Sequence, residues 1–247
     1  MLERRVALPE ATIICVHGGL DRGGSFARLA RRTEHFDLIA YDRRGYQNSR
    51  SLQPLSISLH IEDLLAIMHS ESQRGPVILL GHSFGGVIVL GATLRDTSIS
   101  KLNVVYETPL PWIVKRESTR APLSNDARAE AERFFRRMVS NSAWERLSER
   151  EQESRRLDGP ALLSDLKGLH EGDAPFDLSQ LKVPTLYVYG DGIIRDYYAT
   201  LCAEMSVVSP SVECRGIEHA PHGAHLASPD QLAALIEKEW RNVCASQ

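Results

Sequence analysis

Gly81-His82-Ser83-Phe84-Gly85 is the stretch that decides the fold of this chain. An apolar run at 76–80 precedes it, and a second apolar run at 87–90 follows it. This order predicts a strand, a sharp turn and a helix, with the serine held in a strained conformation at the turn. We therefore expect Ser83 to present a nucleophilic hydroxyl, the alternative being a serine in an ordinary strand-to-helix turn.

Length and charge restrict the class of protein. A chain of 247 residues favours one domain with an insertion over two small independent domains. The net charge of -3 and the mixture of acidic and basic residues give no basic field for nucleic acid and no polybasic segment for a membrane surface. The first residues match neither a signal peptide nor a membrane span, so we expect a cytoplasmic protein whose partner is a small molecule.

The cysteines are widely scattered and form no C-x-x-C motif. This spacing indicates neither a zinc knuckle nor a redox pair. We expect free thiols, mostly buried, at Cys15, Cys202, Cys214 and Cys244.

Short apolar runs alternate with helical patterns along most of the chain. Such alternation predicts an α/β fold with a mostly parallel central sheet flanked by helices. The expected strands are 12–16, 36–41, 76–80, 102–107, 184–189 and 211–215, and the expected helices are 57–72, 84–95 and 230–243.

This alternation stops between Pro109 and Asp177, where the sequence becomes rich in Arg, Glu and Ala. We expect residues 1–110 and 177–247 to form the core and residues 111–176 to form an inserted helical cap. Apolar cap side chains either line a substrate pocket or only attach the cap to the core. The candidates for the pocket are Trp112, Phe134 and Met138, the last two on one helical face with Ala127, Ala131 and Phe135.

A serine nucleophile needs a base, and histidine titrates in the useful pH range. Three histidines, His219, His222 and His225, lie shortly before the C-terminal helix. They also suggest a metal cluster, but there is no H-E-x-x-H motif nearby, and we expect no metal.

Several motifs resemble the α/β-hydrolase superfamily. They are, in order, Val16-His17-Gly18-Gly19, Tyr41-Asp42-Arg43-Arg44-Gly45, the pentapeptide around Ser83, and the loop from Glu218 to Asp230. The resemblance covers nearly the whole chain and implies a triad in the order nucleophile, acid, histidine. It implies His222 as the base, seven residues before Pro229, with His225 as a frequent second histidine that packs the loop.

The resemblance also implies an oxyanion hole. One backbone N–H comes from the turn after the first strand, at Gly19 or Leu20, and the other from Phe84. Arg43 and Arg44 are expected to shape their loop rather than to clamp an anionic substrate.

The triad acid is the least determined member. Relatives commonly carry an aspartate three residues beyond a glycine, but here Gly190 is followed at that spacing by Ile193. A second position, at the end of the preceding strand, is occupied by Glu107, which needs a compensating partner if it is buried. We expect Glu107 to be the acid, with Asp191 as the alternative.

These residues imply acyl transfer to water through an acyl-enzyme, with an ester, thioester or lactone as the substrate. No cofactor is expected, because the chain has no glycine-rich loop of the Walker or dinucleotide-binding type. The same scaffold also supports C–C hydrolases and cofactor-free haloperoxidases. A non-catalytic small-ligand receptor is the alternative from another class.

Overall fold

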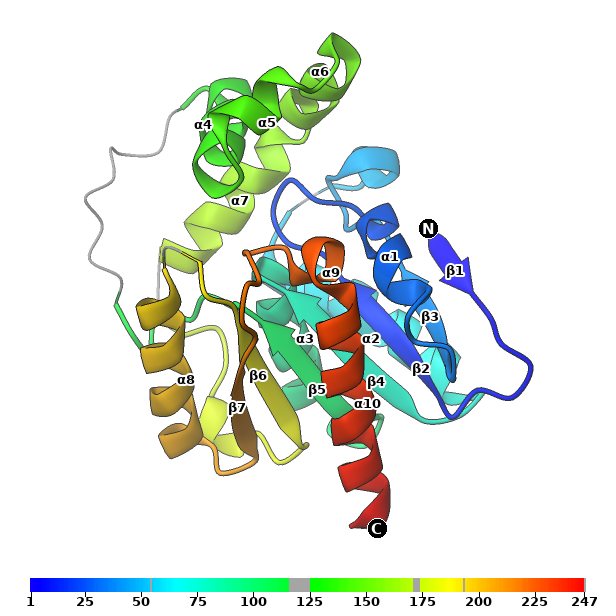
Figure 1. The fold of residues 1–247 in the computed structure, drawn as a ribbon. Coiled ribbons are helices and arrows are strands. Elements are labelled where there is room, and N and C mark those ends of the chain that lie inside the picture. The colour runs from blue at the N-terminus through cyan, green and yellow to red at the C-terminus, as the bar shows by residue number, and fades with distance from the viewer. Residues whose placement is uncertain (54, 116–124, 171–173, 193, 247) are drawn as a thin grey trace.

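A seven-stranded sheet lies at the centre of the molecule (Figure 1). The computed structural model describes residues 1–53, 55–115, 125–170, 174–192 and 194–246. The strand order is β1-β3-β2-β4-β5-β6-β7, and all neighbours are parallel except β1, which pairs antiparallel with β3. The strands are β1 (Leu2–Arg4), β2 (Ala11–Val16), β3 (Phe36–Ala40), β4 (Val77–His82), β5 (Ser100–Tyr106), β6 (Thr185–Tyr189) and β7 (Val212–Gly216).

The α/β fold and its mostly parallel sheet are confirmed, and all six expected strands are present. The three-residue edge strand β1 was not predicted. Its sequence, Leu2-Glu3-Arg4, is too short and too polar to show strand periodicity, and its pairing depends on the neighbouring strand β3.

Helices cover both faces of the sheet, because successive strand residues point to opposite sides. On one face, residues such as Leu79 pack against α2 (Ile57–Ser72), α3 (Phe84–Arg95) and α8 (Arg195–Val208). On the other face, residues such as Leu80 pack against α1 (Ala27–Ala30) and α10 (Pro229–Ala245). A short helix, α9 (Ala224–Ala227), precedes α10, and 3-10 turns occupy Gly23–Phe26, Gln47–Ser49 and Leu178–Gln180.

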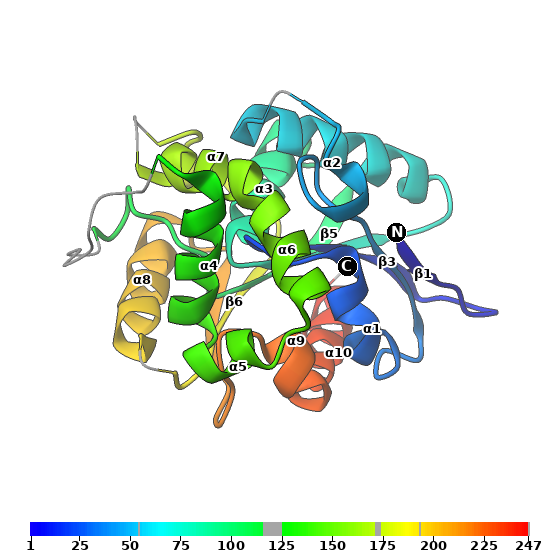
Figure 2. The same cartoon turned by 90° about the horizontal axis from the view of Figure 1, so that it is seen from above.

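Among the described residues between β5 and β6, four helices sit above one end of the sheet (Figures 1 and 2). The Asp126 carboxylate accepts hydrogen bonds from the backbone N–H groups of Arg128 and Ala129 in the first turn of the first of these helices, as an N-cap. Apolar side chains from the helices enclose Leu20 and Tyr46 of the sheet's loops in a separate small core. The four helices are α4 (Ala127–Met138), α5 (Asn141–Glu145), α6 (Glu149–Leu157) and α7 (Gly159–His170).

A buried ion pair links these helices to the sheet. Arg43 Nη2 lies 2.6 Å from Asp165 Oδ2 on α7, and the Tyr46 hydroxyl donates to the same oxygen at 2.6 Å. Burial on its own raises the pKa of Asp165, but the Arg43 charge and the hydrogen bonds from His60 and Arg43 together outweigh burial and lower the pKa to about 2. Both partners are therefore charged at neutral pH, and each compensates the burial of the other.

The expectation of four free thiols was wrong. Cys202 and Cys214 form a disulfide, with their Cα atoms 5.9 Å apart, while Cys15 is free and buried and Cys244 is free and exposed. The pairing arises because α8 packs against β7, which brings together two cysteines that are 12 residues apart in sequence. Sequence spacing alone does not reveal this packing.

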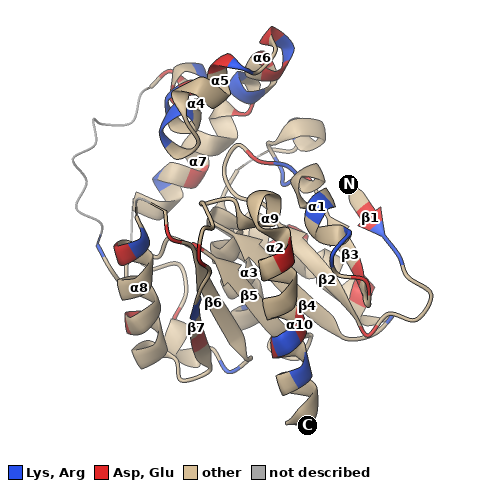
Figure 3. Cartoon of the chain, viewed as in Figure 1, with Lys and Arg blue, Asp and Glu red and all other residues tan. Residues whose placement is uncertain are grey.

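Acidic and basic residues are mixed on the outer helices α4–α6 (Figure 3), where they form pairs such as Arg128–Glu153 and Arg156–Glu132. This pattern gives no extended surface of one sign there. Within the described ranges, no helix has the length and apolar character needed to cross a membrane.

Candidate active site

Ser83 lies in a sharp turn between β4 and α3. Its backbone has φ 52° and ψ -124°, a region that non-glycine residues rarely adopt and that costs about 1–3 kcal/mol. A Cβ atom at Gly81 would lie 2.4 Å from the Gly86 Cα, and one at Gly85 would lie 2.1 Å from the Val16 oxygen. The turn therefore requires glycine at these positions, and it raises Ser83 at the carboxyl end of the sheet.

Glu107 and His222 form the shortest polar contact beside this turn. Glu107 Oε2 lies 2.5 Å from His222 Nδ1, and Glu107 Oε1 accepts a hydrogen bond of 2.9 Å from the Gly190 N–H. The carboxylate is almost completely buried, with 1% of the residue exposed. Glu107 also has a positive φ of 45° and directly follows β5, which pairs with β6.

Asp191 has a different position. Its carboxylate accepts a hydrogen bond of 2.7 Å from the His219 N–H, and its own N–H donates to the Ala220 oxygen at 3.1 Å. Asp191 thus shapes the backbone of the loop that carries His222, and Glu107 is the carboxylate that contacts the ring. Ile193 lies outside the described residues.

The environment of His222 favours its neutral form. Burial lowers its pKa, and the hydrogen bond and charge of Glu107 partly offset this effect, so the pKa lies below the usual histidine value. With Nδ1 engaged by Glu107, Nε2 is the ring nitrogen left to accept a proton. The Tyr106 hydroxyl donates to the neighbouring Pro221 oxygen at 2.7 Å and holds the loop in place.

The turn after β2 passes close to Ser83. A Cβ atom at Gly18 would lie 3.0 Å from the Ser83 Cβ, and the next residues are Gly19 and Leu20, the latter with φ 53°. Phe84 is the first residue of α3, where backbone N–H groups have no partner within the helix. The two backbone segments expected to supply the oxyanion hole therefore both lie next to Ser83.

Arg43 supports the turn after β2. Its Nε donates to the His17 oxygen at 2.9 Å, its Nη2 donates to the Gly18 oxygen at 3.3 Å, and its guanidinium lies over the Phe84 ring. Arg44 instead forms an ion pair of 2.7 Å with Asp63 on α2. Both arginines are thus engaged by the protein itself.

Two cavities meet at Ser83, and both are lined by Gly19, Phe134 and Met138. The narrower one, of about 90 Å³, extends under α7 past Leu162 and Leu166. The wider one, of about 370 Å³, extends along the histidine loop and also includes Leu20, Asp21, His82, Pro221, His222 and His225.

Trp112 is not among the residues that line either cavity. Its ring packs edge-on against Phe176, with ring centres 5.7 Å apart. Sequence reasoning missed Tyr198, whose ring stacks on that of His222 at 6.2 Å, and the α7 residues of the narrow cavity. The apolar face of α7 was visible in the sequence, but its position over Ser83 was not.

A family model described as "Alpha/beta hydrolase family" matches residues 13–235. The chain belongs to the alpha/beta hydrolase family. As a member of this family, it has curated relatives that include the pimeloyl-[acyl-carrier protein] methyl ester esterase of Xanthomonas oryzae pv. oryzae (strain MAFF 311018), with 26% identity over 92% of this chain and 93% of that protein.

A second relative of this α/β hydrolase is lipase LipV of Mycobacterium tuberculosis. The two proteins are 30% identical over a stretch that covers 37% of this chain and 35% of LipV. Among solved structures, a lipase-esterase related protein from Clostridium acetobutylicum ATCC 824 has a TM-score of 0.73 and 18% identity, covering 96% of this chain and 97% of that one. At this identity, the structural likeness shows the fold alone.

Proposed function

We propose that this α/β hydrolase cleaves an ester, thioester or lactone of a small molecule through an acyl-enzyme on Ser83. The observation that carries the proposal is the 2.5 Å contact between Glu107 and His222, beside a strained serine turn that lines the same cavity as His222. In the proposed triad, His222 is the base and Glu107 is the acid that orients it.

In the first step, His222 Nε2 accepts the Ser83 proton while the serine oxygen bonds to the substrate carbonyl carbon. The carbonyl oxygen becomes an oxyanion, which the backbone N–H groups of Gly19 and Phe84 stabilise, with Leu20 as the alternative to Gly19. The imidazolium then gives its proton to the leaving oxygen or sulfur. Water then attacks the carbonyl carbon of the acyl-enzyme through the same proton transfers, and the carboxylic acid product leaves Ser83. Only the substrate and water are consumed.

The two cavities have different roles in this mechanism. His222 gives its proton to the leaving group, so the leaving group occupies the wider cavity, which His222 lines. The acyl group then extends into the narrow cavity, where Leu162, Leu166 and Met138 offer an apolar wall. This arrangement favours a slender, mainly apolar acyl chain.

The relative from Xanthomonas oryzae is named as a methyl ester esterase of a carrier-bound acyl group. That name supports an ester with a linear acyl chain as the first substrate class to test. The cytoplasmic location stays a prediction, and the Cys202–Cys214 disulfide weighs against it, because disulfides persist mainly in oxidising compartments.

A chain-length series of nitrophenyl and methyl esters tests the proposed function. The wild type is compared with Ser83→Ala and Leu162→Trp, the latter filling the narrow cavity. We expect no turnover above background by Ser83→Ala, and by Leu162→Trp a preference shifted toward short acyl chains. A folded wild-type protein that binds these esters without hydrolysing any of them would contradict the proposal and favour the receptor alternative.

A further inference from the structure

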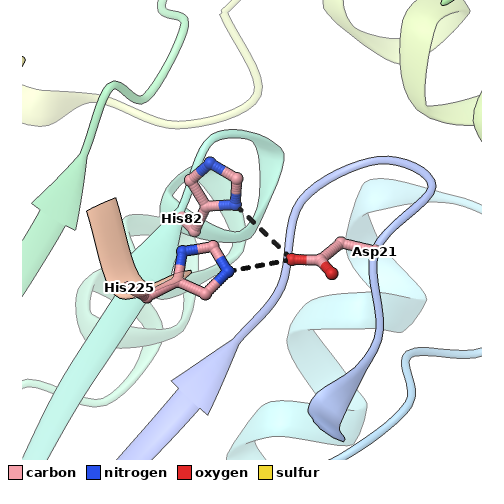
Figure 4. Close-up of side chains that lie close together, drawn as sticks. All are labelled: Asp21, His82 and His225. Atoms are coloured by element: carbon pink, nitrogen blue, oxygen red, sulfur yellow. Dashed lines mark ion pairs between the residues drawn. The ribbon is translucent and has the colours of Figure 1, made fainter. Parts of the chain in front are cut away.

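Three ionisable side chains converge in the wider cavity next to the proposed triad (Figure 4). Asp21 comes from the loop after β2, His82 ends β4, and His225 belongs to α9. Asp21 Oδ2 lies 3.3 Å from His225 Nε2 and 3.8 Å from His82 Nδ1, and the three atoms lie within 4.8 Å of one another.

The hydrogen bond at Nε2 of His82 determines whether the other ring nitrogen, Nδ1, carries a proton or a lone pair. Its Nε2 lies 2.7 Å from the backbone oxygen of His222, which can only accept, so Nε2 carries a proton. In the neutral ring, Nδ1 therefore carries a lone pair, and this lone pair faces the Asp21 carboxylate. Two lone pairs facing each other repel unless a cation or a proton lies between them.

Neither His82 Nδ1 nor His225 Nε2 makes a hydrogen bond to any described residue, and both atoms are buried. The side chain of His225 is 2% exposed and that of His82 is 10% exposed. Buried polar atoms without a partner are rare in folded proteins and indicate a missing partner. Both of these atoms point toward Asp21 (Figure 4).

The residue types fit a transition metal, and the two His–Asp distances of 3.3 and 3.8 Å are close to the spacing of two ligands on one ion. Two imidazoles and one carboxylate are common ligands of Zn²⁺ and related ions, and two ligands each about 2.1 Å from a tetrahedral ion lie about 3.4 Å apart. Histidines that bind metals usually donate their other N–H to a backbone carbonyl or carboxylate, as His82 does. The Ser25 hydroxyl donates to Asp21 Oδ2 at 3.0 Å, a contact that helps to orient the carboxylate.

We propose that Asp21, His82 and His225 form a binding site for one divalent transition-metal ion of the Zn²⁺ type, with its remaining coordination positions facing the wider cavity. The ion joins the loop after β2, the end of β4 and the helix α9, so binding stabilises the folded protein. The proposal departs from the expectation of no metal, which considered only His219, His222 and His225. His222 is engaged by Glu107, and the sequence does not place Asp21 or His82 near His225.

Titration of the untagged, metal-stripped protein with Co²⁺ and Zn²⁺ at pH 7.5 tests the site without reference to ester turnover. Calorimetry gives the stoichiometry, the visible spectrum of Co²⁺ gives the coordination number, and thermal unfolding gives the stabilisation. We expect one ion per chain, Co²⁺ bands of a four- or five-coordinate ion that Zn²⁺ displaces, and a higher Tm.

Asp21→Asn and His225→Gln should weaken binding by at least about tenfold, since each removes one of three protein ligands. His69→Gln is the matched control, because His69 lies 3.2 Å from Asp96 in an exposed His–Asp pair, and it should leave binding unchanged. Absence of saturable binding by the wild type, or equal binding by Asp21→Asn and His225→Gln, would overturn the proposal in favour of a proton shared by the cluster. If neither variant folds, the wild-type Co²⁺ spectrum and stoichiometry decide alone.

Discussion

The Glu107 carboxylate lies 2.5 Å from Nδ1 of His222, although the two residues are 115 positions apart in the chain. The contact spans the carboxyl ends of β5, β6 and β7, and the Gly190 N–H holds the second carboxylate oxygen. A buried carboxylate needs compensating partners, and these two contacts supply them for Glu107. The proposed mechanism depends on this pair.

Substitution of the two candidate acids distinguishes their roles. We expect Glu107→Gln to lower kcat for a nitrophenyl ester by about 10⁴-fold with the fold retained, because the amide no longer stabilises the imidazolium. Asp191→Asn should keep most of the activity, because the Asp191 carboxylate contacts the backbone N–H and the exposed ring of His219. Steady-state kinetics with circular dichroism as a folding control give the result, and the opposite ranking would reject Glu107 as the acid.

The pH dependence of kcat/KM reports the ionisation of His222 in the free enzyme. Burial lowers the pKa of His222, so we expect the activity to rise with pH through a midpoint below the usual histidine value of about 6.5. Glu107 raises this pKa, so the midpoint should fall further in Glu107→Gln, measured on its residual activity. A wild-type midpoint above 7 would disagree with the buried environment of the ring.

Removal of Asp165 should destabilise the protein strongly. Asp165→Asn leaves the buried Arg43 without its counter-charge, and breaking a buried pair in this way costs about 3–5 kcal/mol. Asp63→Asn is the control, because it breaks the partly exposed pair with Arg44, which is worth about 0–1 kcal/mol. Urea unfolding measures both, and equal effects would show that the Arg43–Asp165 pair does not link α7 to the sheet energetically.

The same carboxylate should contribute to acid unfolding. The pKa of Asp165 is lowered to about 2 in the folded protein from 3.8, so its stabilisation is complete above about pH 4 and is lost as the pH falls toward 2. In Asp165→Asn this part of the pH dependence should be absent. Urea midpoints measured between pH 5 and pH 2.5 check the expectation.

The disulfide predicts a thiol count. Denatured, unreduced protein should react with two equivalents of Ellman's reagent, at Cys15 and Cys244, and reduced protein with four. The protein must be purified without reductant and under air for this test. Four reactive thiols before reduction would show that Cys202 and Cys214 remain unpaired.

Much of the fold follows from local sequence signals. The strand, glycine and helix pattern around Ser83 is contained within about fifteen residues, and the apolar runs of the other parallel strands are equally local. The edge strand β1 escaped prediction because only its pairing with β3 makes it a strand. The Cys202–Cys214 disulfide escaped because helix-on-strand packing, not spacing, brings the two sulfurs together.

The site was less predictable because it is assembled from distant segments. Ser83 and the loop around His222 carry recognisable patterns, whereas the choice between Glu107 and Asp191 depends on where two strand ends point in space. The cluster of Asp21, His82 and His225 joins three segments that have no motif in common. Such clusters become visible only when the loops at the carboxyl ends of the strands are placed together.

Reaction with a fluorophosphonate probe tests the central claim most directly, because only an activated serine attacks it at neutral pH. The wild type should gain the mass of one probe, located by peptide mapping at Ser83, and Ser83→Ala should gain none. Labelling should slow by orders of magnitude in His222→Ala, which lacks the proposed base. Folded wild-type protein that remains unlabelled, or that is labelled equally in Ser83→Ala, would contradict the assignment of Ser83 as the nucleophile.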